Sequence, residues 1–277
     1  MDAFANVPRA GKIAMRFETD EGDQDPSDRL IGVTLLTEDD DVFLATRNGR
    51  AIRFRATDVR EVKSRTSTGM RGARLREDDE VISLSILRTT PFDNETREAY
   101  LRAAPWKEGD REATLSAEDM AAMQRGEEFI LTVCANGYGK RTSAYEYRRI
   151  GRGGQGITNI ENLDRNGPVV ASFPAHNGEQ LMLVTDQAKV IRMSVGDTRV
   201  IGRNSAGVKL FDVAENEHVV SAARLDEEVE AENDAEALVA DDLGAVPAAD
   251  QITLDDGTGP QTLAERVEEE DPEGDGE

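Results

Sequence analysis

The sequence predicts an all-β fold: a propeller-like array of four-stranded blades in an incomplete ring, with one helical insertion and a disordered acidic tail. Three observations support this prediction. A unit of about 45 to 50 residues recurs along the chain, short apolar runs in each unit are separated by turn signals, and negative charge gathers at the C-terminus. The 277 residues leave room for one large domain or two ordinary ones.

Charge divides the chain into a nearly neutral body and an acidic tail. The formal net charge is −23, but 20 acidic residues and a single basic one, Arg266, lie within residues 225–277. This segment has no aromatic residue, so it cannot bury enough apolar surface to offset the entropy of ordering, and we expect it to be disordered. The total charge argues against a nucleic-acid partner, whereas the body alone leaves that class open.

Three hairpins recur at equivalent positions. "DVFLATRNGRAIRF" begins at Asp41, "EFILTVCANGYGKRT" at Glu128 and "EQLMLVTDQAKVIRM" at Glu179. Asn-Gly in the first two turns is a strong hairpin signal, and the residues after each turn tend to alternate as in a half-buried strand. The repeats define one partial and three whole blades, at residues 1–40, 41–87, 128–175 and 176–224.

One segment, residues 88–127, interrupts the repeats. In "SAEDMAAMQRG", Ser116 is suited to be a helix N-cap, Asp119 follows three residues later and Gly126 can end the helix. We therefore predict an inserted loop with one short helix, exposed and partly mobile, in which Trp106 acts as a packing anchor.

A loop rich in glycine and arginine follows each hairpin. One arginine recurs at the second hairpin strand, a second arginine 12, 11 and 11 residues later, and a glycine four residues after that. These three sets are Arg53, Arg141 and Arg192; Arg65, Arg152 and Arg203; and Gly69, Gly156 and Gly207. Glycine lets a backbone approach an anion closely, and arginine adds charge-assisted hydrogen bonds to phosphate, so the loops are candidate phosphate contacts.

The candidate DNA-binding set consists of the cations and glycines of these loops and of the strands before them. Its members are Arg53, Arg60, Lys63, Arg65, Arg71, Arg74, Lys140, Arg141, Arg148, Arg149, Arg152, Gly153, Gly154, Arg192, Arg203 and Lys209. Phosphate contacts of this kind position a duplex without reading its base sequence. A single loop of this composition is also typical of a solvated surface, but recurrence at a fixed repeat position favours one common charged edge.

Several stretches resemble the C-terminal domain of the A subunit of bacterial DNA gyrase. They are "AGKIAMRF", "TGMRGARLREDDEVISL", "ANGYGKRTSAYEYRR", "GRGGQGI" and "IGRNSAGVKLFDVAENEHVVS", and they follow the family's order across residues 4–225. "IGRGGQG", residues 150–156, is similar to the family's heptapeptide Gln-Arg-Arg-Gly-Gly-Lys-Gly, with Gln155 in place of the lysine.

This resemblance implies a β-pinwheel holding about the last four of the family's blades. It implies a basic rim that wraps double-stranded DNA and thereby supports ATP-dependent negative supercoiling by the holoenzyme. The implied protein partners are the breakage-reunion domain of the A subunit, together with the gyrase B subunit. Two alternatives remain open: the corresponding domain of topoisomerase IV, and a propeller-like scaffold that binds protein. The tail is either an autoinhibitory mimic of DNA or a solubilising segment.

No catalytic residue, metal site or cofactor is expected in this chain. None of Tyr100, Tyr138, Tyr145 and Tyr147 lies in the Arg-Tyr-Thr setting of the resembled family's nucleophile. His176 and His218 are far apart in sequence with no second ligand nearby, and the chain contains no Walker motif. No apolar run approaches the roughly 20 residues that span a membrane. The N-terminus lacks the order of a signal peptide, so we expect a cytoplasmic, nucleoid-associated protein.

Overall fold

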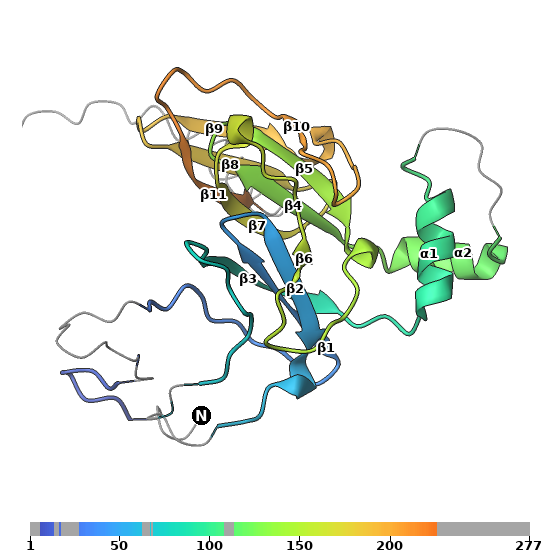
Figure 1. Ribbon diagram of the computed structural model, residues 1–277, viewed down its shortest axis with the longest axis horizontal. Helices are drawn as coiled ribbons and strands as arrows, with labels where there is room; N and C mark the ends of the chain where they lie inside the picture. Colours follow the sequence, from blue (N-terminus) through green and yellow to red (C-terminus); the bar gives the residue numbers. More distant parts are fainter. Residues whose placement is uncertain are drawn as a thin grey trace, which may run out of the picture. The chain divides into compact units, whose positions relative to one another are not determined.

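The computed structural model describes residues 6–13, 17, 28–62, 67, 69–107 and 114–225. Strands make up most of its regular structure, which confirms the all-β fold class (Figure 1). The expected acidic tail lies outside the described residues apart from Leu225, as do two of the candidate DNA contacts, Lys63 and Arg65.

Three antiparallel hairpins form at the three predicted places. They are β1–β2 (Asp40–Thr46 and Arg50–Arg55), β4–β5 (Phe129–Cys134 and Tyr138–Ser143) and β8–β9 (Gln180–Thr185 and Val190–Ser194). In the first two turns only the glycine of the Asn-Gly pair is left-handed, with φ of +79° at Gly49 and +77° at Gly137. Ala188 takes this place in the third turn, with φ of +58°.

Each hairpin is extended by a strand that follows it in the chain. The added strands are β3 (Val81–Arg88), β7 (Val169–Ala175) and β11 (Val219–Leu225), which pair antiparallel with β1, β4 and β8. A one-turn 3-10 helix follows each hairpin: η2 (Ala56–Asp58), η3 (Ala144–Glu146) and η5 (Val195–Asp197). A further 3-10 turn, η4 (Asp164–Asn166), precedes β7.

The fourth strand of a sheet comes from the following repeat. The strand β6 (Ile157–Thr158) pairs with β2, and β10 (Val208–Lys209) pairs with β5. The first sheet therefore has the order β3-β1-β2-β6 and the second β10-β5-β4-β7, while β11-β8-β9 form a third sheet of three strands among the described residues. This exchange ties successive blades together.

The partial blade expected over residues 1–40 is not formed in the described part of that segment. Between residues 6 and 39 the described positions contain no strand. Leu30, Val33 and Leu35 are instead largely exposed. An alternating apolar pattern forms a stable strand only where a neighbouring strand satisfies its backbone, and the described residues supply none here.

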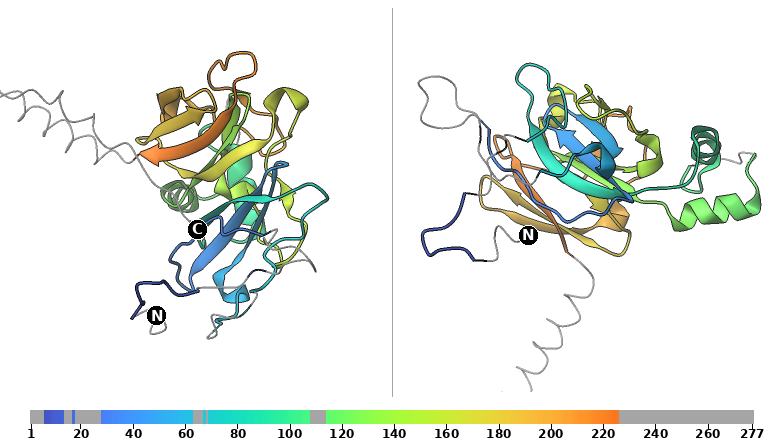
Figure 2. Two further views of the ribbon diagram at one scale, coloured as in Figure 1. Left: turned by 90° about the vertical axis from the view of Figure 1, so that its left-hand side faces the viewer. Right: turned by 90° about the horizontal axis from the view of Figure 1, so that it is seen from below.

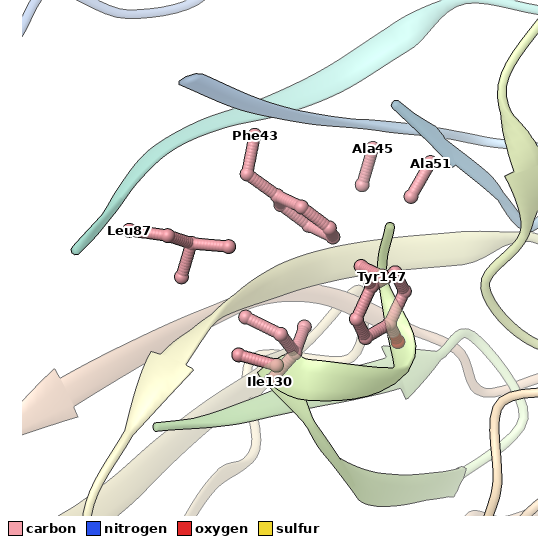
Figure 3. Close-up of a cluster of buried hydrophobic side chains, with 7 residues drawn as sticks. Phe43, Ala45, Ala51, Leu87, Ile130 and Tyr147 are labelled. Atoms are coloured by element: carbon pink, nitrogen blue, oxygen red, sulfur yellow. The ribbon is translucent and has the colours of Figure 1, made fainter. Parts of the chain in front are cut away.

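Two of the hydrophobic cores lie between neighbouring sheets rather than within one repeat. Phe43 on β1 and Leu87 on β3 meet Ile130 on β4 and Tyr147, which follows η3 (Figure 3). The rings of Phe43 and Tyr147 pack edge to face with centroids 5.1 Å apart. The same arrangement recurs between the second and third sheets. Because these two cores are shared, the packing of one blade depends on the next.

The insertion is more ordered than its sequence predicts. Besides the expected helix, here α2 (Ala117–Arg125), it contains α1 (Asn94–Ala103), and the two lie together at one side of the sheets (Figures 1 and 2). The Ser116 hydroxyl accepts a bond from the Asp119 N–H, which confirms the predicted cap. Tyr100 and Met123 are fully buried against Tyr145 of η3, which lies outside the insertion. In its described residues the insertion is therefore not an exposed loop.

Within the described ranges, no helix has both the length and the apolar surface that crossing a lipid bilayer requires.

Candidate nucleic-acid interface

The arginine that recurs at the second hairpin strand joins neighbouring repeats. Arg53 is buried, and its guanidinium donates to Asp41 Oδ2 (2.7 Å) and to the carbonyl of Ala144 in the next repeat (3.0 Å). Arg141 is buried in the same way and donates to the Thr198 carbonyl of its next repeat (2.7 Å). The expectation that these two arginines present charge to DNA is therefore wrong: the protein itself takes up their donors.

Lys140 is also enclosed by the protein. Its side chain is fully buried, and Nζ donates to the carbonyls of Gly202 (2.8 Å), Arg203 (2.7 Å) and Ser205 (3.0 Å). Burial, which disfavours the ammonium form, lowers the pKa of Lys140 from 10.5 to about 7. Lys140 holds the loop of the next repeat from inside, so its expected place in a DNA contact is corrected as well.

In the second and third repeats, the recurring glycine serves the exchange of strands. Gly156 and Gly207 have φ of +69° and +80°, and each lies directly before an exchanged strand. A Cβ on Gly156 would stand 2.5 Å from the Ala51 carbonyl oxygen, and one on Gly207 2.7 Å from that of Gly139. Because no Cβ fits there, glycine is required for β6 and β10 to join the preceding sheet.

The N–H groups of Gly153 and Gly154 are also used inside the protein. Gly153 donates to the Gly72 carbonyl (2.8 Å), and Gly154 donates to the Gly151 carbonyl (3.3 Å). Their expected role as donors to an anion is therefore corrected, because both donors already have acceptors.

Arg152 and Arg203 occupy equivalent places and reach back to the preceding repeat. Arg152 donates to the carbonyls of Asp58 (2.9 Å) and Arg71 (2.7 Å), and Arg203 donates to that of Thr158 (3.2 Å). Both side chains are half-buried. Their charges therefore lie at the junctions between successive loops and stay partly open to solvent.

Successive loops lie side by side through their backbones. The Arg74 N–H donates to the Gly154 carbonyl (2.9 Å), which joins the loop of the first repeat to that of the second. The Glu161 N–H donates to the Ser205 carbonyl (3.0 Å), which joins the second repeat to the third. Residues far apart in sequence thus meet along one set of neighbouring loops, as a shared edge requires.

Among the candidate cations that the structure describes, six have exposed side chains. They are Arg60, Arg71, Arg74, Arg148, Arg192 and Lys209. Arg71 and Arg74 belong to the joined loops, Arg148 begins the second of them, and Lys209 lies on β10 with its Nζ 2.6 Å from Asp212 Oδ1. The carboxylate of Asp212 raises the pKa of Lys209. Four of these six cations therefore lie in the loops, whereas Arg192 lies on hairpin strand β9 and Lys209 on β10.

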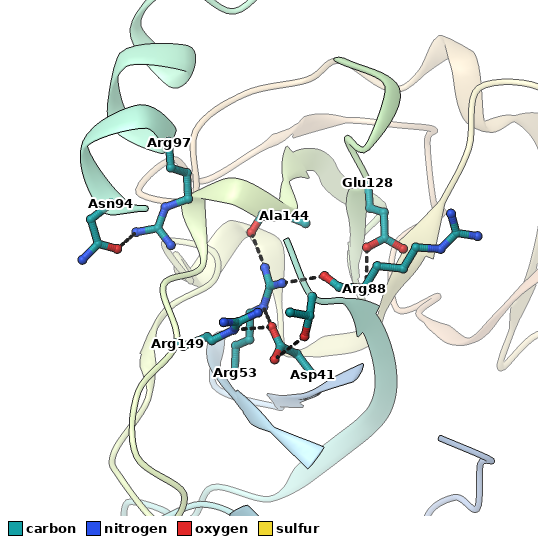
Figure 4. A network of polar contacts seen from close by, with 9 residues as sticks. Asp41, Arg53, Arg88, Asn94, Arg97, Glu128, Ala144 and Arg149 are labelled. Atoms are coloured by element: carbon teal, nitrogen blue, oxygen red, sulfur yellow. Dashed lines mark hydrogen bonds and ion pairs between the residues drawn. The ribbon is translucent and has the colours of Figure 1, made fainter. Parts of the chain in front are cut away.

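Arg149 turns inward to a cluster that the local sequence patterns do not predict. Its Nε lies 2.8 Å from Asp41 Oδ2, the oxygen that also accepts from Arg53 (Figure 4). Arg97 of α1 approaches the same place. A local signal for α1 is present, because Asp93 is its N-cap and accepts a hydrogen bond from the Thr96 N–H. No repeat indicates, however, that Arg97 of this helix would lie near Arg53 and Arg149.

The architecture defines a class: β-pinwheel proteins, in which blades exchange their fourth strand. The family model described as "DNA gyrase C-terminal domain, beta-propeller" matches residues 40–88, 128–176 and 179–226. These segments make up more than half of the sequence, and the chain belongs to this family.

Curated relatives agree with this assignment. The chain is 42% identical over 235 residues to the A subunit of DNA gyrase from Rickettsia bellii, covering 81% of this chain and 25% of that protein. It is 44% identical over 243 residues to the A subunit of DNA gyrase from Granulibacter bethesdensis, covering 79% and 25%. The chain thus spans about a quarter of the length of these relatives.

Two solved structures share the fold. A DNA gyrase A C-terminal domain superposes with a TM-score of 0.57 at 20% identity, covering 79% of this chain and 59% of the other. A DNA topoisomerase IV C-terminal domain gives 0.58 at 21% identity, covering 82% and 57%. The two scores are nearly equal, so the fold alone does not separate gyrase from topoisomerase IV, whereas the similar sequences named above are gyrase subunits.

Proposed function

We propose that this chain is the DNA-binding and DNA-wrapping part of a DNA gyrase A subunit. In this role it contacts the phosphate backbone of duplex DNA without reading its sequence and supports negative supercoiling by an ATP-consuming holoenzyme. Its partners are then the breakage-reunion domain of the A subunit, together with the gyrase B subunit, and its place in the cell is the nucleoid.

The observation that carries this proposal is the side-by-side arrangement of equivalent cationic loops. Arg71 and Arg74 of one repeat are held against the loop of the next, where Arg148 is exposed and Arg152 half-buried. Guanidinium groups at successive blades can engage successive phosphates along a bent duplex. Smooth bending of 20 to 30 base pairs costs on the order of 1–6 kcal/mol, so several such contacts have to act together.

Binding that rests on phosphate contacts has to be sensitive to salt. Each phosphate neutralised contributes a slope of about −0.9 to the dependence of log K on log salt concentration. Removing three contacting arginines should therefore reduce that slope by about 2 to 3 and weaken binding to all duplex sequences alike.

The test compares two triple variants of the full chain with equal loss of charge. The first replaces Arg71, Arg74 and Arg148 with alanine. The matched control replaces three exposed arginines away from the loops, Arg47, Arg102 and Arg125. Affinity for a linear duplex of about 100 base pairs is measured by fluorescence anisotropy between low and moderate salt.

We expect a clear loss of affinity and a shallower salt slope for the loop variant, and little change for the control. Equal losses in the two variants would show that only net charge matters, which contradicts an interface at the loops. Absence of salt-sensitive binding by the unaltered chain would favour a protein-binding scaffold instead.

A further inference from the structure

A cavity of about 230 Å³ lies between helix α1 and the beginning of the first hairpin. Three arginines from different parts of the chain border it: Arg53 from β2, Arg97 from α1 and Arg149 from the loop after η3 (Figure 4). The remaining lining residues are Thr90, Phe92 and Asn94. Because α1 lies outside the segments that the family model matches, this cavity is not part of the repeated blade plan.

The positive charge around the cavity exceeds the negative charge that faces it. Asp41 is the carboxylate paired with the arginines, and its Oδ2 accepts from Arg53 (2.7 Å) and from Arg149 (2.8 Å). Three guanidinium groups against this one carboxylate leave two positive charges in excess. Beyond the lining, Glu98 and Arg148 also act on Arg97, with opposite signs.

Two of the arginines have hydrogen-bond donors without acceptors. Arg97 Nη2 donates to Asn94 Oδ1 (2.9 Å), but its Nε is buried and has no partner in the described part of the chain. Arg149 Nη2 is likewise buried and unpartnered there, whereas its Nε is bound to Asp41. Nearly all buried polar groups in proteins have partners, so two unpaired donors on arginines that line this cavity indicate hydrogen bonding that the described part of the chain does not satisfy.

We propose that this cavity binds a dianionic phosphate group, either inorganic phosphate or the terminal phosphate of a phosphomonoester, between Arg97 and Arg149. The charge of a phosphomonoester at neutral pH, between about −1.5 and −2, matches the excess of the cluster, whereas a backbone diester carries a single charge. Planar guanidinium groups are suited to hold phosphate oxygens through paired N–H donors.

The electrostatics of Arg97 agree with this assignment. Burial lowers the pKa of Arg97, and the nearby charges of Arg53, Arg149 and Arg148 lower it further. A bound oxyanion would relieve this repulsion. It would also join α1 of the insertion to Arg149, which lies in the second blade's loop.

The first experiment titrates the full chain with inorganic phosphate at constant ionic strength set by chloride. The signals of arginine Nε–H groups in nitrogen-15 NMR spectra report binding at the guanidinium groups. We expect saturable shifts from the unaltered chain. Shifts that do not saturate, or that chloride alone reproduces, would overturn the proposal.

Substitutions then place the site. Arg97→Gln and, separately, Arg149→Gln should each weaken phosphate binding at least tenfold, while Arg102→Gln on the exposed side of the same helix should stay within twofold of the unaltered chain. Circular dichroism verifies that each variant is folded. If Arg97→Gln disturbs α1, Arg149→Gln decides. Unchanged binding in a folded Arg97 or Arg149 variant would overturn the proposal.

A third arm distinguishes the sources of phosphate. Monomethyl phosphate, a dianion, is compared with dimethyl phosphate, a monoanion, and with a short duplex that has hydroxyl ends. We expect at least tenfold preference for monomethyl phosphate and no effect of the duplex on the Arg97 signal. Equal binding of the two esters, or a duplex that shifts Arg97, would assign the cavity to the DNA interface and refute a dianion site. Failure of DNA binding at the loops would not alter this result.

Discussion

Replacing Gly156 with alanine tests whether the recurring loop glycine is kept for strand exchange. At φ of +69° an L residue in the left-handed region is strained by roughly 1–2 kcal/mol. The new Cβ would stand 2.5 Å from the Ala51 carbonyl oxygen, so the loop has to move away from β2.

That movement breaks the pairing of β6 with β2, which consists of Arg50 with Thr158 and Ala51 with Ile157. Each lost hydrogen bond costs about 0.5–1.5 kcal/mol. Together with the backbone strain, we expect Gly156→Ala to lower the free energy of unfolding by about 2–4 kcal/mol.

The assay is urea unfolding followed by circular dichroism, with Gly151→Ala as the matched control in the same loop. A Cβ on Gly151 would have nothing within 4 Å, so this variant should stay within about 0.5 kcal/mol of the unaltered chain. If both variants unfold at the same urea concentration as the unaltered chain, the argument that Gly156 is fixed by close contact with β2 is wrong.

Three further predictions concern side chains at the blade junctions and hairpin turns. Ala188→Gly should raise the free energy of unfolding by about 0.5–1 kcal/mol in urea titrations, because glycine relieves the strain at φ of +58°; a loss would contradict this. Lys140→Met should lower the free energy of unfolding by about 1–3 kcal/mol, because three carbonyl groups lose their hydrogen-bond donor. Unchanged stability would show that the ammonium group is dispensable. Bonds from Lys189, from the Ala214 N–H and from Thr185 lower the pKa of Glu217 from 4.5 to about 2. The stabilisation by its ionised carboxylate is therefore complete above pH 4.5 and lost as pH falls toward 2. Glu217→Gln should flatten the dependence of the melting temperature on pH over that range. A pH dependence equal to that of the unaltered chain would refute the assignment.

The sequence identified what is periodic in this protein. Hairpins at three equivalent places, the cap at Ser116 and the all-β class follow from local patterns, and the structure confirms each. Local patterns also located the loops that the proposed interface uses. What they could not supply was the direction in which each side chain points.

Arg53 and Arg141 illustrate this limit. Their recurrence predicts a ligand contact, but a side chain that links each repeat to the next also recurs once in every repeat. Only the packing of successive sheets, which buries both guanidinium groups, separates the two explanations. The same holds for Gly156, because the short distance to Ala51 exists only once β6 has joined the preceding sheet.

The sequence alone determined the repeat, the hairpins and the family, because these depend on residues close together in the chain. The tertiary structure decided which cations face solvent and which ones hold blades together. It also decided that Arg97 lines one cavity with Arg53 and Arg149, the two arginines that pair with Asp41. Burial and contacts between distant segments decide whether an arginine or lysine side chain is charged and free to bind a ligand. Neither burial nor such contacts can be read from residues that are neighbours in the sequence.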